Sequence, residues 1–138
     1  MMKSALRLSF LFVSTTALLA QSSPADRILG DWWTPNHEST VQIVKCGNAF
    51  CGSIKSMQAP KNDAHNPDSS LRGRPLVGTQ IMKDFQYSGS DTWSGGTLYA
   101  PARGKTVNPE LVLSAPDTLD IKVKAGMMSK TVMWTRAK

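Results

Sequence analysis

The feature that most limits how this chain can fold is a series of short β-rich runs separated by clusters of Gly, Pro, Asn and Asp. After residue 25 there is no heptad, repeat or low-complexity tract, and helical periodicity is almost absent. Many short strands with frequent turn signals are typical of an all-β sandwich or barrel. The runs that we expect to form strands are 28–34, 40–45, 50–57, 76–85, 92–99, 106–107, 111–114, 118–124 and 130–136.

Alternation of apolar and polar residues indicates that these strands are half buried. In the run Leu119–Lys124 the apolar side chains share one face and the charges the other, and Val41 and Ile43 repeat the pattern with Gln42 outside. About eight antiparallel strands leave two sheet edges to protect, and closure into a barrel removes both edges, which a sandwich does less completely. We therefore predict a small antiparallel β-barrel of about eight strands rather than a sandwich.

The first 25 residues have the pattern of a removable secretion signal, which takes no part in the fold. Lys3 and Arg7 form a basic start, and residues 8–20 are an uncharged apolar run. A membrane anchor is the alternative, but a spanning helix needs about 20 apolar residues. We expect cleavage between residues 20 and 25, and the candidate points follow Ala20, Ser22 and Ala25.

Residues 26–138 have the length of one domain with a modest core. Removal of Lys3 and Arg7 takes the formal charge from +6 to +4 and leaves no Lys/Arg run, so no nucleic-acid partner is expected. The remaining charge suits solubility and weak attraction to anionic envelope surfaces. We predict a periplasmic or secreted protein with no membrane segment after signal removal.

Cys46 and Cys51 both lie in this domain, and export favours a disulfide between them. The Gly47-Asn48 pair between them is a tight-turn signal, so the two cysteines could face each other across a hairpin. A redox pair or a metal site is the alternative, but the spacing is not Cys-x-x-Cys and a thiolate site needs further ligands.

Residues 58–74 are polar and long for a hairpin connection, and long ordered loops are often functional. Within them Asn66 is placed to cap a short helix, Pro67 and Asp68 suit its first turn, and Gly73 can end it. We expect one or two helical turns that cover a barrel end or edge. A plain surface loop is the alternative.

Each end of the domain carries a short tryptophan motif, Gly30-Asp31-Trp32 at the start and Trp134-Thr135-Arg136 at the end. Gly30-Asp31-Trp32 resembles the Gly-x-Trp start of lipocalin-like barrels, in which an Arg from the last strand packs over the Trp at the closed end. Arg136, two residues after Trp134, could do this here, with a cation held over an aromatic face. The resemblance implies structural roles for Trp32, Trp134 and Arg136.

A second resemblance rests on an ordered set of short segments spread over the whole domain. These segments are 30–32, 46–47, 50–54, 66–68, 71–78, 93–101, 104–106 and 134–136. Together they resemble the bacterial secreted family known as domain of unknown function 2147, and Val107 and the segment 124–129 depart from its pattern. The resemblance implies a lipocalin-like barrel in an envelope or secreted protein, and it implies no established activity.

Candidates for catalysis and metal binding are few. His37 beside Glu38, or His65 near acids, could be drawn as an acid/base pair, but no nucleophile motif accompanies either. Asp63, His65 and Asp68 lack any recognised ligand spacing. We therefore expect no enzymatic activity, no metal and no cofactor.

Candidate binding residues are two arginines and two aromatic side chains. Arg72 and Arg74 either pin the loop by pairing with Asp63 or Asp68, or hold a carboxylate or phosphate at the barrel mouth. Trp93 and Tyr99 share a face if one strand runs through both, and they then fill the interior or line a cavity. Gly95-Gly96 between them suggests a bulge or the close approach of another backbone.

Two functions fit these residues. The first is a barrel that binds a small amphipathic or lipid-like molecule, since an eight-stranded barrel has room for about one small ligand. The second is a packed barrel that binds an envelope protein through its surface, as an inhibitor would. The methionines, including the adjacent Met127 and Met128, are expected to serve core and turn packing.

Overall fold

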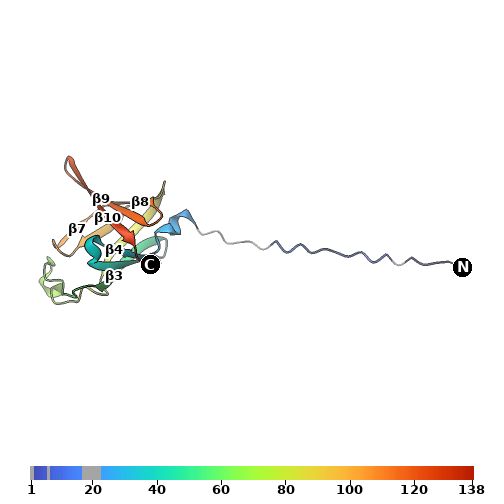
Figure 1. Cartoon of the computed structure of the whole chain (residues 1–138), viewed down its shortest axis with the longest axis horizontal. Coiled ribbons are helices and arrows are strands. Elements are labelled where there is room, and N and C mark those ends of the chain that lie inside the picture. Colours follow the sequence, from blue (N-terminus) through green and yellow to red (C-terminus); the bar gives the residue numbers. More distant parts are fainter. Residues whose placement is uncertain (1, 6, 17–22) are drawn as a thin grey trace.

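The computed structural model describes residues 2–5, 7–16 and 23–138. Residues 23–138 form the barrel, and residues 7–16 lie in an extended segment that points away from it (Figure 1). The proposed cleavage points after Ala20 and Ser22 lie outside the described residues. None of the helices in the described ranges is long and apolar enough to cross a membrane.

Ten short strands follow one another, with three single 3-10 turns and no longer helix in the described residues. The 3-10 turns are η1 (Pro24–Ile28), η2 (Pro35–His37) and η3 (Ser69–Leu71). The strands are β1 (Gly30–Trp33), β2 (Ser39–Cys46), β3 (Ala49–Met57), β4 (Gln80–Gly89), β5 (Thr92–Ser94), β6 (Thr97–Ala100), β7 (Lys105–Val107), β8 (Glu110–Ala115), β9 (Thr118–Ala125) and β10 (Met128–Arg136).

The sheet closes on itself, which confirms the predicted antiparallel barrel. Neighbouring strands run β3-β2-β1-β10-β9-β8-β5-β4, and pairing of β3 with β4 completes a ring of eight strands. All of these pairings are antiparallel. The short strands β6 and β7 continue from β4 as an extension outside the ring.

The barrel interior is filled by side chains from every part of the ring. Strand alternation sends these residues inward, where burial of apolar surface is the main source of stability. The largest of the fully buried side chains are Trp32, Trp93 and Phe85, each at 0% exposure. One contiguous cluster results, formed by Ile28, Trp32, Val41, Ile43, Phe50, Ile54, Leu76, Ile81, Met82, Phe85, Trp93, Leu98, Leu111, Leu113, Leu119, Ile121 and Trp134.

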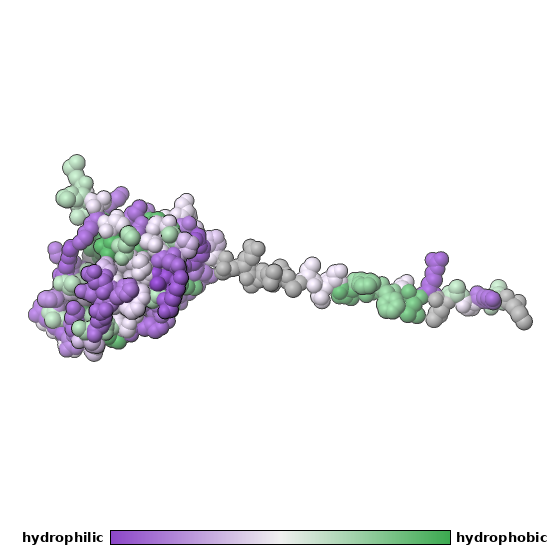
Figure 2. Space-filling model, in the orientation of Figure 1, coloured by the Kyte–Doolittle hydropathy of each residue, from purple (hydrophilic) through white to green (hydrophobic). Residues whose placement is uncertain are grey.

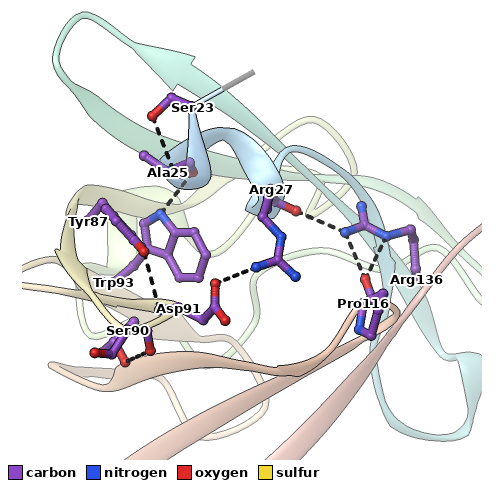
Figure 3. Close-up of polar contacts among 10 residues, drawn as sticks. Ser23, Ala25, Arg27, Tyr87, Ser90, Asp91, Trp93, Pro116 and Arg136 are labelled. Atoms are coloured by element: carbon purple, nitrogen blue, oxygen red, sulfur yellow. Dashed lines mark hydrogen bonds and ion pairs between the residues drawn. The ribbon is translucent and has the colours of Figure 1, made fainter. Parts of the chain in front are cut away.

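Turn η1 closes one end of the barrel (Figure 3). The Trp93 indole nitrogen donates to the Ala25 carbonyl at 3.1 Å, and the Trp32 indole nitrogen donates to the Ile28 carbonyl at 2.9 Å. Arg136 lies over the Trp32 ring with its Cζ 4.3 Å from the ring centroid, and its guanidinium donates to the carbonyls of Arg27, Leu29 and Pro116. The first and last strands are thus joined at this end by one cation and the η1 backbone.

The disulfide between Cys46 and Cys51 is present, as predicted, with Cα atoms 5.9 Å apart. Cys46 pairs with Ala49 across the β2–β3 hairpin, which leaves Gly47 and Asn48 as a two-residue turn. Gly47 has φ +62°, a conformation that glycine adopts without a side-chain clash. Both cysteines are used by this bond, so neither is a thiolate that could bind a metal in this structure.

The run expected at 92–99 is two strands, because Gly95 and Gly96 interrupt it. Gly95 has φ +81°, and a Cβ on Gly96 would lie 2.5 Å from the Lys83 carbonyl oxygen. The break changes which face points inward, so Trp93 and Leu98 are buried whereas Tyr99 is not fully buried. The conditional expectation that Trp93 and Tyr99 share a face is therefore wrong, and the expected close approach of another backbone is observed.

Two other local expectations differ from the structure. The helical turn in the long loop is the single 3-10 turn η3, and Asp68 rather than Asn66 caps it, since the Asp68 carboxylate accepts from Ser70 N at 3.0 Å. Asn66 instead forms a side-chain turn in which its Oδ1 accepts from Asp68 N at 2.9 Å. Strand β4 begins at Gln80 rather than residue 76, because Gly78 has φ +89° and forms part of a turn.

Candidate functional site

The candidate site lies beneath the long loop, which we define as residues 58–79, on the outer face of the barrel. Met82 of β4 pairs with Leu98 of β6, and both side chains are buried in the core. Because successive side chains of a strand alternate, Lys83 and Tyr99 point to the opposite, outer face. The long loop crosses this outer face and covers part of it.

A buried carboxylate anchors the loop there. The Asp63 side chain has 0% exposure, and three side chains donate to it. Its Oδ2 accepts from Asn66 Nδ2 at 2.7 Å and from Arg74 Nε at 3.0 Å, and its Oδ1 accepts from the Tyr99 hydroxyl at 2.6 Å. Asp63 N also donates to the Arg74 carbonyl at 2.9 Å. One acid therefore ties both ends of the loop segment 63–74 to strand β6.

The electrostatics of this cluster keep Asp63 ionised and Tyr99 neutral. Burial alone raises the pKa of Asp63, but the hydrogen bonds from Asn66, Tyr99 and Arg74 and the Arg74 charge outweigh it, so the pKa is lowered. Burial and the hydrogen bond to Asp63 raise the pKa of Tyr99 to about 12. Each donor meets an acceptor, and no buried side-chain polar atom of the described residues lacks a partner.

Close backbone packing holds the loop against the β6–β7 turn. Gly104 has φ +62°, and a Cβ at this position would overlap the His65 carbonyl oxygen. Only glycine satisfies both the left-handed conformation and the close approach. The loop is thus placed by one ion pair network and one backbone contact.

A cleft of about 490 Å³ lies between this loop and the outer face of β4, β6 and β7. Its volume is within the range of small-molecule sites, about 300–1,000 Å³. It is open to solvent, and it combines apolar surface with polar and charged groups. The lining residues are Asn66, Pro67, Asp68, Arg74, Gln80, Ile81, Lys83, Thr97, Tyr99, Gly104 and Thr106.

The structure brings two of the four candidate binding residues together at this cleft. Arg74 and Tyr99 line it, whereas Arg72 lies at its edge and donates from Nε to the Asn66 carbonyl at 2.8 Å. Trp93 is in the barrel core at the η1 end, with its indole bonded to Ala25, and does not reach the cleft. Trp93 and Tyr99 are separated because the face that points inward changes at Gly95-Gly96.

Sequence reasoning missed Lys83 and gave Asp63 too small a role. Lys83 is exposed on the cleft wall, and it forms none of the ion pairs found among the described residues. The polar run of the loop offered several acids, and no local signal marked Asp63 as the buried one. Its partner Tyr99 is 36 residues away, and such a pairing has no sequence pattern.

The histidines and acids show no arrangement for catalysis or metal binding in the described residues. His37 is exposed and stacks on Trp33 with ring centroids 4.6 Å apart. His65 contacts Gly104 through its backbone carbonyl, and its side chain is exposed. No group of three or more His, Cys, Asp or Glu side chains is placed to hold a metal within the described ranges.

Comparisons with known proteins agree with the fold. Residues 30–136 match the family described as "Uncharacterized protein conserved in bacteria (DUF2147)". A solved structure, described as protein HP1028 from the human pathogen Helicobacter pylori and as belonging to the lipocalin family, is 25% identical. It superposes with a TM-score of 0.70 over 80% of this chain and 82% of its own. No curated protein matches the chain. The chain therefore belongs to the bacterial DUF2147 family and has a lipocalin-like barrel fold.

Proposed function

We propose that this protein binds a small amphipathic molecule with an anionic group in the cleft beneath the long loop. The observation that carries the proposal is the composition of that cleft. Two cationic side chains, Arg74 and Lys83, stand beside apolar surface from Pro67, Ile81 and the Tyr99 ring. Ligand sites typically combine apolar walls with a few charged or polar groups that orient the ligand.

The charges at the cleft favour an anion. Arg74 already shares Asp63, but its side chain retains 35% exposure and has further donors to offer. Lys83 also lines the cleft, and it forms no ion pair with any residue that the structure describes. The one acid on the lining is Asp68, whose carboxylate already accepts from the backbone and hydroxyl of Ser70. A carboxylate or phosphate between Arg74 and Lys83 would therefore meet two donors.

The location outside the ring supports this site over an internal one. Trp32, Trp93 and Phe85 occupy the interior, and the cleft is bounded by the loop and the outer face instead. Arg72 adds a third cation close to the cleft, because its Nε donates to the carbonyl of the lining residue Asn66. Positive charge of this kind attracts anionic molecules.

The test is isothermal titration calorimetry of the full chain with decanoate. Decyltrimethylammonium, which has a cationic head on an alkyl chain of similar length, is the comparison ligand. We expect decanoate to bind and the cation not to bind. Lys83→Glu should weaken decanoate binding about tenfold, because an attraction worth on the order of 1 kcal/mol or more becomes a repulsion. Thr97→Trp, which fills the cleft from its floor, should abolish binding.

The matched control is Lys138→Glu, which makes the same charge change at an exposed position after β10 and outside the cleft lining. Its decanoate affinity should equal that of the unaltered protein. Far-UV circular dichroism establishes that each variant folds. Unchanged affinity in the folded Thr97→Trp variant would exclude this cleft as the site.

We also propose that the chain is exported and that its N-terminal segment is a signal peptide. The apolar side chains of that segment lie outside the hydrophobic core and are 71–94% exposed (Figure 2). An apolar run without a partner in water indicates removal or burial elsewhere. Supporting this, the disulfide is of the kind that persists in oxidising compartments. The residues are Leu8, Phe10, Leu11, Phe12 and Val13.

We expect cleavage after Ala20 or Ser22 and not after Ala25. Cleavage after Ala25 would remove the carbonyl that accepts from Trp93 and would cut through η1. Fractionation of expressing cells followed by N-terminal sequencing of the exported form measures this directly. A new N-terminus at Asp26, or retention of the full chain in the cytoplasm, would contradict the proposal.

A further inference from the structure

The hairpin formed by β9 and β10 projects from the barrel and ends in an exposed apolar pair. In Figure 1 this hairpin extends well beyond the ring of strands, and in Figure 2 its end is coloured as hydrophobic. Met127 is 106% exposed and Met128 is 78% exposed. Because both side chains are exposed to water at the tip, they pack neither in the core nor in the turn. The expectation from the sequence that they serve core and turn packing is therefore wrong.

The turn geometry holds this pair outward. Met128 pairs with Ala125, so Gly126 and Met127 form a two-residue turn, and Gly126 has φ +61°. Glycine at the first position of a two-residue hairpin turn is typical of a tight, regular connection. Because the turn is short and the strands stay paired up to it, the geometry of the hairpin fixes the position of the two methionines.

Lysines surround the apolar pair, and acids are absent from the tip. Lys124 and Lys130 lie next to it on the two strands, and Lys122 follows further down β9. None of the three forms an ion pair found among the described residues. The sequence has no Asp or Glu from residue 121 to the C-terminus. Two exposed methionines flanked by lysines are complementary to an anionic lipid surface. The lysines can contact the headgroups, and the methionines can contact the acyl chains.

We propose that the tip of the β9–β10 hairpin docks this protein on the surface of an anionic lipid bilayer. The two methionine side chains enter the headgroup–acyl boundary, and Lys124 and Lys130 contact the anionic headgroups. With only two apolar side chains and two nearest lysines, binding is weak and reversible, because a single short anchor is marginal by itself. The proposal does not depend on the ligand cleft.

The experiment is co-sedimentation of residues 23–138, which form the barrel, with vesicles of phosphatidylcholine, alone or mixed in equal parts with phosphatidylglycerol. The N-terminal segment is left out because its exposed apolar run and its basic start, Lys3 and Arg7, would bind the same vesicles more strongly than the tip. We expect binding to the mixed vesicles to fall about tenfold in Met127→Ser/Met128→Ser and about tenfold in Lys124→Gln/Lys130→Gln. The lysine variant should also lose most of the dependence of binding on salt.

The matched controls are Met133→Ser and Lys61→Gln. Met133 is an exposed methionine lower on β10, paired with Asp120, and Lys61 is exposed in the long loop. Both controls should bind mixed vesicles as the unaltered protein does. All substituted positions are exposed, and urea unfolding confirms that each variant keeps its stability.

One result would overturn the proposal: binding of either double variant to the mixed vesicles with unchanged strength. If the unaltered hairpin, but not the variants, were then cross-linked to a protein in cell extracts, the tip would be a protein-docking site instead.

Discussion

Replacing Asp63 by alanine will lower the free energy of unfolding by about 2–4 kcal/mol. Removal of one partner of a buried ion pair is strongly destabilising, and each buried donor left without an acceptor costs about 1–3 kcal/mol. Asn66 and the Tyr99 hydroxyl lose their acceptor outright, whereas Arg74, at 35% exposure, can turn to water. Urea unfolding followed by far-UV circular dichroism measures the loss.

The loss will depend on pH in a defined direction. The pKa of Asp63 is lowered below its ordinary value of 3.8 in the folded protein, so its contribution is complete above that value and disappears as the pH falls through the folded pKa. The pKa of Tyr99 is raised from 10.0 to about 12, so its contribution is complete below pH 10 and disappears as the pH rises towards 12. The difference between the unaltered protein and Asp63→Ala should therefore be largest between about pH 4 and pH 10.

Asp68→Ala is the matched control, because Asp68 is an exposed aspartate in the same loop. It loses the cap of η3 and no buried partner, so its loss of stability should be clearly smaller than that of Asp63→Ala. Equal losses for the two alanine variants, or a loss for Asp63→Ala that does not change with pH, would show that Asp63 does not anchor the loop.

Replacing Trp32 by alanine will have the second large effect, a loss of about 3–5 kcal/mol of unfolding free energy. The side chain has 0% exposure at the closed end, and its removal leaves a cavity that the surrounding strands can fill only in part. Arg136 also loses the ring beneath it, and the Ile28 carbonyl loses its donor. Because a domain of this size has about 5–15 kcal/mol of stability, the variant should unfold at much lower urea concentration.

Trp33→Ala provides the comparison within the same strand. Trp33 is partly exposed on the opposite face of β1, where it stacks on His37, so its loss should be about 1 kcal/mol. Arg136→Met keeps most of the side-chain volume and removes the donors to Arg27, Leu29 and Pro116. If Trp32→Ala were no more destabilising than Trp33→Ala, the closed end would not be a stabilising element.

Most strands of this protein could be predicted because their signals are local. Alternation in 118–124 marks a half-buried strand, and Gly47-Asn48 marks the turn of the disulfide hairpin. The meeting of Trp32 and Arg136 is a long-range contact, and it was reached through resemblance to lipocalin-like barrels rather than through spacing. In the structure they are directly paired in the β1–β10 register.

The candidate cleft could not be predicted in full. A strand through residues 92–99 would place Trp93 and Tyr99 on one face, but the break at Gly95-Gly96 changes the inward face. Sequence patterns suggest a bulge at paired glycines without giving the direction in which the chain leaves it. Lys83 was missed because an exposed lysine on a strand has no local signal that separates it from any other.

The sequence by itself determined that the chain is a series of short strands, which residues face inward on the regular ones, and that closure into a barrel is favoured over a sandwich. These properties depend on a two-residue period and on turn residues, which are local. Only the tertiary structure decided that the long loop crosses the outer face, that Asp63 joins Tyr99, and that the cleft lies outside the barrel. Those contacts link residues tens of positions apart, so they are set by strand order, register and the path of the loop.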